Sequence, residues 1–523
     1  MEPRGYRYRG GHMSQVELVV YAATSAGVCA AVAAARAGAQ VTLVEPGQHV
    51  GGMTSGGLGY TDVGDPRVLG GMAEQLRNNI AEHYGVAAGT YAGPEPHVAE
   101  AIYRRWLDEA GVTVVFGERI DRVTRTDNRI ERLVTLSGNE YAAGVFIDAS
   151  YEGDLLALAG VPFRVGREDR SLHSERFAGR QELVPGMHNM PPWVSPFRDD
   201  VTGVTKGALL PQLRPGPLAE VGVGDGGVMS YGYRLCLTNS TDRIPFTMRD
   251  GYDEAHWELG RRLFRQWKSE GREPTAGRML GLELNLPGGK ADGNSLGPFS
   301  LSVLDGSAWR YPTAEPTERE EIRLHHLHHA QDFLWFLSHD PAVPIGIRRE
   351  LEGWGLAADE FTDTEHFPHQ LYVREARRMV GEYILTEHDL LDSRQHDDVI
   401  AMGSYHIDIR EVQRTWRWVY EHPRPLGTTF TEGYLSVPVR PFGIPYRTML
   451  PHPVDCANLI VPVCISASHV AFASVRMEVQ YQMLGHAAGV AAEIALRFGT
   501  DPHEIDRRLL QRRLLGDGQI LTI

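Results

Sequence analysis

The first fifty residues carry the pattern that most constrains how this chain can fold. An apolar, β-branched run, Val16–Tyr21, precedes a turn of small residues and an alanine-rich segment, Val28–Ala37. A second apolar run, Val41–Val44, then ends in Glu45. Short apolar runs bounded by turns are typical of buried parallel strands, and the alanine-rich segment is typical of the helix that connects two of them. We therefore predict an α/β fold that begins with a Rossmann-like βαβ unit.

The turn before the expected helix indicates a dinucleotide site. A helix N-terminus offers free N–H groups to a pyrophosphate, and a carboxylate that ends the second strand can accept hydrogen bonds from ribose hydroxyls. The glycine fingerprint is degenerate, because Ala22 and Thr24 stand in place of the first two glycines of G-x-G-x-x-G and Gly27 is the third. A βαβ unit that binds no nucleotide is the alternative.

Two glycine doublets, Gly51–Gly52 and Gly56–Gly57, follow Glu45 closely. Glycine loses much conformational entropy on folding, so such a concentration indicates backbone that turns tightly or lies along a ligand. A ligand with a ribityl chain and an isoalloxazine ring accounts for this second stretch, whereas a bare NAD site does not need it. The pattern therefore favours FAD.

Six further motifs lie in order along the chain. They are GGMTSGGLGYTD (51–62), FIDASYEGD (146–154), YGYRLC (231–236), LPGGKADGN (286–294), ISASH (465–469) and LGHAAG (484–489). In this order they resemble the bacterial FAD-dependent oxidoreductases of the FAD_oxidored type, relatives of the glutathione-reductase and fumarate-reductase flavoproteins. The resemblance runs from Val19 to about Phe498. Ala22 departs from it, because relatives usually keep a glycine there, and we expect a slightly shifted turn.

The resemblance implies a fold and a domain organisation. We expect an FAD-binding domain of the glutathione-reductase type, formed by 16–167 and 440–499, with an inserted α+β substrate or cap domain at 168–439 and a tail at 500–523. Noncovalent FAD is favoured, because Val50 occupies the place of the histidine that carries flavin in fumarate-reductase relatives. The expected cofactor contacts are Ala23, Thr24, Ser25, Ala26, Gly27, Glu45, Pro46, Gly51, Gly52, Met53, Ser55, Gly56, Gly57, Asp154, Ser474 and Val475.

A C-terminal helix is expected to face the flavin. Its pattern runs over 475–498, after a strand at 459–463, and its small residues favour close packing. His469, just before this helix, is the preferred general base, with a hydrogen-bonded loop histidine as the alternative. Arg476 is expected in the first helical turn, where a cation is unfavourable unless it offsets an anion or binds an acidic substrate. A salt bridge to Glu478 or Asp154 is the other possibility.

The expected insert holds further candidates. One short stretch contains a phenol, an imidazole and a carboxylate: Tyr405, His406 and Asp408. If this stretch forms a strand, His406 and Asp408 share one face and could act as an oriented acid/base pair. The alternative is that they are simply neighbours on the surface. Arg234 is a candidate for gripping a substrate carboxylate. The remaining substrate candidates alternate along one segment and could line the substrate pocket: Lys290, Asp292 and Asn294.

Composition excludes several function classes. The net charge of −15, from 67 acidic against 52 basic side chains, disfavours nucleic acid. The four cysteines form no CxxC pair, and the histidines of 325–329 lack the HExxH pattern. We therefore predict that the protein binds no metal and that these histidines lie on one face of a helix. The segment 1–11 lacks an apolar core, so we expect no signal peptide; with no apolar run long enough to span a bilayer, we expect a cytoplasmic protein.

These observations predict an enzyme. We expect an FAD-dependent oxidoreductase that transfers a hydride from a C–H bond of a small polar or natural-product-like metabolite to flavin N5, with oxygen or another redox partner as electron acceptor. A flavin monooxygenase or reductase and a non-catalytic flavin-binding protein are the alternatives. A two-dinucleotide reductase is disfavoured, because the middle of the chain shows no second βαβ fingerprint and the chain has no CxxxxC pair.

Overall fold

A computed structural model describes residues 17–91, 93–184, 188–392, 394–420 and 423–523. Two expectations lie outside these residues: that the first strand and the FAD-binding domain begin near Val16, and that 1–11 is no signal peptide. No helix in the described ranges is long and apolar enough to cross a membrane.

The chain contains both helices and strands throughout the described residues. The helices are α1 Ser25–Arg36, α2 Gly71–Tyr84, α3 Pro96–Ala110, α4 Asp154–Leu158, α5 Arg170–His173, α6 Glu258–Ser269, α7 Gly277–Leu280, α8 Pro316–His339, α9 Ile345–Leu351, α10 Glu387–Leu391, α11 His469–Val475, α12 Glu478–Phe498 and α13 Arg507–Gly516. The strands are β1 Leu18–Tyr21, β2 Val41–Glu45, β3 Thr113–Phe116, β4 Ile120–Thr126, β5 Arg129–Thr135, β6 Glu140–Ala142, β7 Val145–Asp148, β8 Phe163–Arg164, β9 Leu235–Thr238, β10 Arg243–Ile244, β11 Lys290–Gly293, β12 Gly355–Ala357, β13 Arg378–Met379, β14 Val399–Gly403, β15 Ile407–Ile409, β16 Gln413–Val419, β17 Leu426–Glu432, β18 Leu435–Val437, β19 Phe442–Pro445 and β20 Leu459–Ile460.

The predicted βαβ unit forms the centre of a parallel sheet. Strand β1 pairs in parallel with both β2 and β7, and the five-stranded order is β20-β7-β1-β2-β3. Strand β20 joins this sheet from the far end of the chain, beside β7. The chain is therefore a mixed α/β protein whose two terminal thirds share one parallel sheet.

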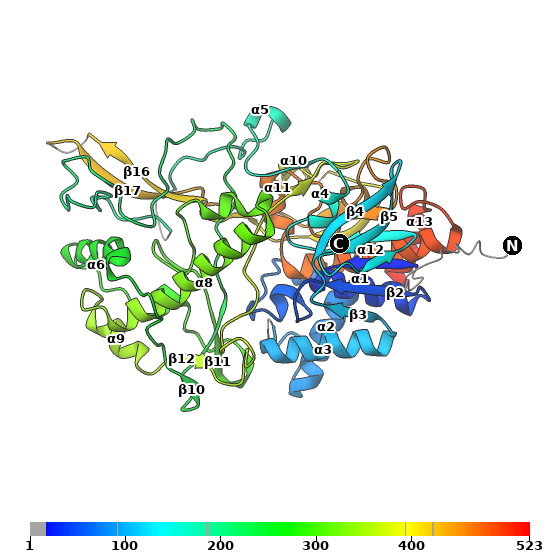
Figure 1. Ribbon diagram of the computed structural model, residues 1–523, viewed down its shortest axis with the longest axis horizontal. Coiled ribbons are helices and arrows are strands. Elements are labelled where there is room, and N and C mark those ends of the chain that lie inside the picture. Colours follow the sequence, from blue (N-terminus) through cyan, green and yellow to red (C-terminus); the bar gives the residue numbers. More distant parts are fainter. Residues whose placement is uncertain (1–16, 92, 185–187, 393, 421–422) are drawn as a thin grey trace.

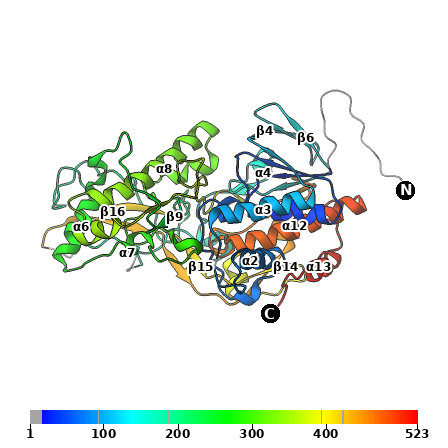
Figure 2. The same cartoon turned by 90° about the horizontal axis from the view of Figure 1, so that it is seen from below.

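The parallel sheet lies between two layers. Leu18 and Val20 of β1 belong to the core that includes α1 and α12, whereas Val19 and Tyr21 belong to the core beneath β4, β5 and α4. Figure 2 shows α1 and α12 on one side of the parallel sheet and the antiparallel sheet β4-β5-β6 on the other. Burial on both faces explains why β1 is continuously apolar rather than alternating.

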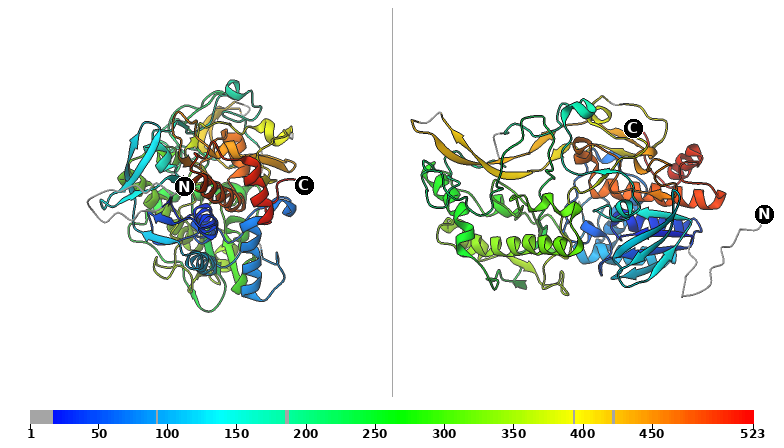
Figure 3. Two further views of the ribbon diagram at one scale, coloured as in Figure 1. Left: turned by 90° about the vertical axis from the view of Figure 1, so that its right-hand side faces the viewer. Right: turned by 45° about the horizontal axis from the view of Figure 1, so that its top comes forward.

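The molecule is elongated. Figure 1 and the right-hand view of Figure 3 place the parallel sheet and α13 towards one end of the long axis, and α6, α8, α9 and the hairpin β16–β17 towards the other. The left-hand view of Figure 3, along that axis, brings the red α13 and the blue helices forward. A four-stranded sheet, β10-β12-β9-β11, belongs to the middle part of the sequence.

Helices α1 and α12 cross at very short range. A Cβ built at Gly485 would lie 2.2 Å from Ala26 O, and one built at Gly489 would lie 2.1 Å from Ala30 O. Only glycine permits backbones to approach this closely, so the prediction that small residues of this helix allow close packing is confirmed. The crossing holds the C-terminal part of the chain against the N-terminal βαβ unit.

The C-terminal helix begins later than predicted. The expected helix at 475–498 is two helices, because α11 ends at Val475 and α12 begins at Glu478, with Met477 in an extended conformation between them. Arg476 therefore follows the C-terminal end of α11 and is not in the first turn of α12. The prediction that its cation opposes a helix dipole is wrong for this reason.

Strands β4 and β5 form a hairpin around Asp127, and α6 and α8 are helices of the middle region of the chain. The strand expected at 459–463 is shorter, β20, and the Tyr405–Asp408 segment leads into β15.

We predict that Gly489→Ala destabilises the protein by about 1–3 kcal/mol, the usual cost of overpacking, even though alanine is the better helix former. The new methyl group would meet Ala30 O. Gly516→Ala in α13 is the matched control, because open space surrounds its Cβ position. Urea unfolding measures both; a Gly489→Ala variant as stable as the control would contradict the crossing.

Candidate functional site

The turn between β1 and α1 has the backbone conformation that favours glycine, although alanine occupies the position. Ala22 has a φ of +72°, in the left-handed region, and its N–H donates to Val44 O at 2.8 Å. Thr24 caps α1 by accepting a hydrogen bond from Gly27 N at 3.2 Å and donates to Ala149 O at 2.7 Å. The tight turn is thus retained despite Ala22, and the first turn of α1 presents N–H groups that have no intrahelical acceptor.

Glu45 lies at the mouth of this turn, where the sequence predicted it. Its carboxylate accepts hydrogen bonds from Ala23 N at 2.6 Å and from Gly47 N. Burial raises the pKa of Glu45 to about 7, although these two N–H groups act in the opposite direction. Two of its four acceptor positions remain for hydroxyl donors.

The glycine doublets are packed against protein. Gly51, Gly52 and Gly57 have φ values of +104°, +56° and +122°. A Cβ at Gly52 would lie 2.4 Å from the Tyr151 hydroxyl, and one at Gly57 would lie 2.2 Å from Arg234 O. Positive φ angles and these close contacts account for the doublets without a ligand, so the doublets alone do not establish a flavin site.

A buried carboxylate at the start of α12 ties this loop to α1. Glu478 accepts hydrogen bonds from Ser25 Oγ, from Thr54 Oγ1 at 3.1 Å and from the Tyr151 hydroxyl at 2.6 Å. Burial raises its pKa. The Tyr151 hydroxyl also accepts from Met53 N at 2.9 Å. The segment that carries the first glycine doublet is therefore fixed to both helices.

His469 belongs to a buried ionic network. Its Nδ1 lies 2.8 and 2.9 Å from the two carboxylate oxygens of Glu375, and its side chain is 1% exposed. Its Nε2 is buried and has no hydrogen-bond partner among the described residues. In the neutral imidazole, an Nδ1–H that donates to the carboxylate leaves the lone pair on Nε2. Sequence analysis did not identify Glu375, which no local pattern connects with His469.

Arg378 holds the carboxylates of this network in place. Its guanidinium pairs with Glu375 and Glu168, and Glu168 also accepts from His469 N at 2.9 Å. Burial acts to raise the pKa of Glu168, but Arg378 and this N–H hold it below its usual value. Glu168 therefore remains a charged acceptor beside His469.

A second cluster gathers four of the predicted residues at the other end of α11. Arg476 donates to Asp408 Oδ2 at 2.8 Å and to the Tyr372 hydroxyl at 3.1 Å. The expected salt bridge of Arg476 to Glu478 or Asp154 is wrong, because Asp408 is its partner. His406 Nε2 lies 3.8 Å from Asp408 Oδ1, and the Tyr405 ring packs on the His406 ring with centroids 4.1 Å apart.

The remaining cofactor candidates have separate partners. Ser474 Oγ donates to Tyr405 O, and Ser55 Oγ donates to Val50 O at 2.6 Å. Asp154 pairs with Arg319 and Arg377, both at 2.8 Å. Asp154 is thus held by two guanidinium groups and not by the α1 turn.

Arg234 is already paired within the protein. Its Nε donates to Asp292 Oδ1 at 3.0 Å, and its Nη2 donates to Asp292 Oδ2. Both side chains are buried. A bidentate pair of this kind leaves little free charge for a substrate carboxylate. Asn294 Oδ1 accepts from Ser295 N at 2.7 Å.

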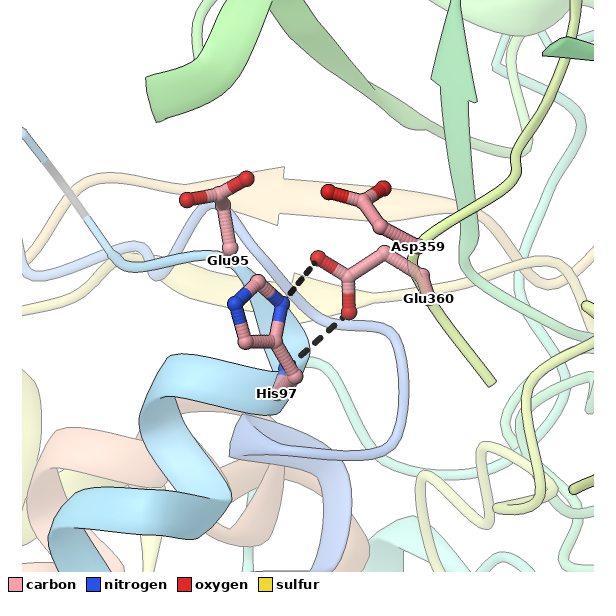
Figure 4. A group of neighbouring side chains, drawn as sticks. All are labelled: Glu95, His97, Asp359 and Glu360. Carbon is pink, nitrogen blue, oxygen red and sulfur yellow. Dashed lines mark hydrogen bonds and ion pairs between the residues drawn. The ribbon is translucent and has the colours of Figure 1, made fainter. Parts of the chain in front are cut away.

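Four acidic and imidazole side chains converge near the N-terminus of α3. Figure 4 shows Glu95, His97, Asp359 and Glu360 pointing towards one another, an arrangement with metal-ligand character. The Lys290 ammonium lies 2.5, 2.8 and 2.7 Å from Glu95, Asp359 and Glu360. Burial opposes its charge, but these carboxylates raise its pKa. The cation of this cluster is therefore the protein's own lysine.

The histidines of α8 contact different partners. His325 Nε2 lies 2.7 Å from Asp305 Oδ2, and His329 Nε2 lies 3.0 Å from Ser300 O. Burial lowers the pKa of His329 to about 3. Although His325 and His329 are one helical turn apart, they contact different residues and do not form a shared metal site.

A cavity of about 580 Å³ lies elsewhere. It is lined by residues of α1, α2, α12 and α13, among them Arg36, His486 and Arg513, and by none of the predicted site residues. The cavity lies at the C-terminal end of α1, away from the free N–H groups of its first turn.

The residues of the α1 turn fit a dinucleotide. Free N–H groups, small side chains at Ala22 and Ala23, and the Glu45 carboxylate match the donors, space and acceptors that a pyrophosphate and a ribose require. This fit concerns the nucleotide half of such a cofactor. The candidates for residues near its reacting half are the two side-chain clusters at the ends of α11.

The match to a family model agrees with this fit. A family model described as FAD dependent oxidoreductase matches residues 17–514. No curated protein matches the chain. Among solved structures, a mutant flavin monooxygenase from Stenotrophomonas maltophilia is 18% identical over 26% of this chain and 38% of its own, with a TM-score of 0.20. L-proline dehydrogenase from P. horikoshii is 15% identical over 30% of this chain and 59% of its own, with a TM-score of 0.23. The chain thus spans less than two thirds of either protein.

We predict a pH-dependent contribution of Glu45 to the stability of the ligand-free protein. Its folded pKa of about 7 lies above the ordinary 4.5, so the folded state keeps the proton longer than the unfolded chain. The free energy of unfolding therefore falls as pH rises from about 4.5 to 7, by at most about 1.4 kcal/mol per pH unit.

Urea unfolding of the wild type and of Glu45→Gln across this range tests it. The difference between the two should fall with rising pH and then level off. Glu109→Gln, on the exposed face of α3, is the control and should show no such trend. A difference that is constant or grows with pH would contradict the buried carboxyl group.

Proposed function

The chain belongs to the FAD-dependent oxidoreductase family, and from this premise we propose that it oxidises a small polar or natural-product-like metabolite by removing a hydride from a C–H bond. FAD, held noncovalently, would supply the hydride acceptor at N5. The observation that carries the proposal is the buried pair of His469 and Glu375, whose outer imidazole nitrogen has no partner among the described residues.

The nucleotide half of the cofactor is assigned to the α1 turn. Backbone N–H groups of Ser25 and Ala26 would face the pyrophosphate, because they belong to the first turn of α1. The carboxylate of Glu45 would accept hydrogen bonds from ribose hydroxyls. Glu478 would act by holding α1, α12 and the 51–55 loop in register, since it bonds to Ser25, Thr54 and Tyr151.

His469 is the proposed general base. Its Nε2 lone pair takes the proton of the substrate O–H or N–H as the hydride leaves carbon, so the substrate loses one proton and one hydride. Glu375 fixes the tautomer and stabilises the imidazolium that results, and Arg378 keeps Glu375 in position. Burial on all sides excludes bulk water from this proton transfer.

Arg476 is proposed to stabilise negative charge that develops on the flavin or the substrate. Asp408 connects Arg476 with His406, which packs against Tyr405. Arg476 lies at the opposite end of the seven-residue helix α11 from His469. His406 is the alternative base, because it is partly exposed and close to a carboxylate.

We also propose the domain organisation expected from the sequence. The segments 16–167 and 440–499 would form the FAD-binding domain, 168–439 an inserted substrate domain, and 500–523 a tail. In support, β20 joins the sheet of β1 and β7. The boundary is interwoven, because β13 pairs with β8 and β15 packs near α11.

We predict that FAD is released intact into the supernatant on acid precipitation of the loaded protein. Glu45→Ala should weaken FAD binding by about 1.5–3 kcal/mol, the range for hydrogen bonds to a charged group. Equilibrium dialysis followed by absorption of the released flavin measures both. Yellow colour that stays with the pellet would contradict noncovalent binding, and an unchanged affinity of Glu45→Ala would remove Glu45 from the nucleotide site.

We predict that His469→Ala slows anaerobic flavin reduction about 10²–10⁴-fold, the usual contribution of a general base. Stopped-flow absorption with a substrate that reduces the wild type is the measurement, at matched FAD content. His406→Ala is the control and should stay close to the wild type. A His469→Ala rate within about threefold of the wild type, combined with a slow His406→Ala, would transfer the role to His406.

A further inference from the structure

One buried guanidinium near the proposed base has no carboxylate partner. Arg374 is 4% exposed, its Nη1 donates to Ser230 O, and its guanidinium carbon lies 4.4 Å from the centroid of the Tyr372 ring. No ion pair of the described part of the chain includes it. A carbonyl oxygen and an aromatic face do not neutralise a buried charge, whose desolvation is costly.

Two further guanidinium groups lie around the same tyrosine and its neighbours. Arg476 donates to the Tyr372 hydroxyl at 3.1 Å. Arg410 donates to Ser295 O at 3.0 Å and pairs with Glu411 at 3.3 Å. Burial, together with the positive charges of Arg410 and Arg476, lowers the pKa of Arg374 to about 9.

The carboxylates nearby are already engaged. Asp408 is bound by Arg476, and Glu411 is bound by Arg410 and by His188 Nδ1 at 2.5 Å. Glu375, next to Arg374 in the chain, faces Arg378 and His469 instead. The three arginines around Tyr372 thus share two carboxylates, which leaves an excess of one positive charge.

Buried hydrogen-bonding atoms without partners belong to the same group of residues. They are Ser230 Oγ, Ser295 Oγ and Arg476 Nε. Ser230 and Ser295 are each 1% exposed and already give their carbonyl oxygens to Arg374 and Arg410. Buried donors are almost always paired, so several unpaired donors beside an excess positive charge indicate a site for an acceptor-rich anion.

We propose that Arg374, with Arg410 and Arg476, binds a carboxylate group of the substrate; this inference rests on the proposed function and names its substrate class. A carboxylate matches the single excess charge, and its two oxygens match the planar donor fork of a guanidinium. Arg374 and Glu375 are consecutive, so the backbone connects the proposed acid site to the residue that orients His469. The substrate is therefore a small carboxylic acid.

Isothermal titration calorimetry of the FAD-loaded protein tests this without electron transfer. The probes are acetate, pyruvate and benzoate, each paired with its neutral amide. We expect at least one acid to bind, and to bind more tightly than its amide. Arg374→Met should weaken that binding about 10- to 100-fold, as for loss of a hydrogen bond to a charged group.

Two variants keep the test interpretable. Arg417→Met is the matched control, because Arg417 also lies over an aromatic ring, that of Phe430 at 5.5 Å, but is exposed; it should bind the acid as the wild type does. Arg374→Lys keeps the charge without the fork and should fold even if Arg374→Met does not. It should bind the acid several-fold more weakly than the wild type.

The proposal is overturned if no acid binds the wild type, if amides bind as tightly as acids, or if Arg374→Lys binds the acid like the wild type. These outcomes are separate from failure of the proposed function. A protein that binds carboxylates but whose flavin no acid reduces would refute the reaction and leave the site standing. A protein that oxidises a neutral substrate and ignores carboxylates would do the reverse.

Discussion

The structure depends on the close crossing of α1 and α12. Gly485 and Gly489 let α12 lie directly on the backbone of α1 at Ala26 and Ala30. This contact brings a segment from the end of the chain to the first βα turn, and it places Glu478 where it can bond to Ser25 and Thr54. The short helix α11 leads into this crossing, so the positions of His469 and Arg476 depend on it as well.

Buried charge is the second constraint on the site. The pairs of Arg378 with Glu168 and Glu375, and of Arg476 with Asp408, are almost fully removed from solvent. Breaking one partner of such a pair costs more than the intact pair contributes, because the other charge is left uncompensated. These networks therefore fix side-chain orientation more than they raise stability. That role suits a site in which a histidine and a guanidinium must be held in place.

Local patterns in the sequence predicted the local structure well. The continuously apolar runs and the alanine-rich segment identified β1, β2 and α1. The break between α11 and α12 was not predicted, because Arg476 and Met477 continue a helical pattern in the sequence. In the structure, Arg476 instead donates hydrogen bonds to Asp408 and Tyr372. Likewise, the doublets at 51–57 were correctly seen as constrained backbone, but much of that constraint comes from protein contacts.

Partners distant in sequence could not be predicted. Glu375 and His469 are 94 residues apart, and no spacing rule connects them. Arg234 and Lys290 were expected to face a substrate, yet carboxylates of the protein surround both. Conversely, Arg374 was overlooked because an unpaired buried guanidinium is visible only once its neighbours are known. The family resemblance supplied the cofactor, whereas the candidate chemistry comes from contacts that only the fold creates.

A crystal structure of the FAD-loaded protein with a bound carboxylic acid would test the central claim most directly. The account predicts that His469 Nε2 lies within hydrogen-bonding reach, about 3 Å, of the group that loses its proton, with Glu375 still on Nδ1. A bound acid whose reacting carbon lies over the flavin but far from His469, or a flavin placed away from α11, would contradict it.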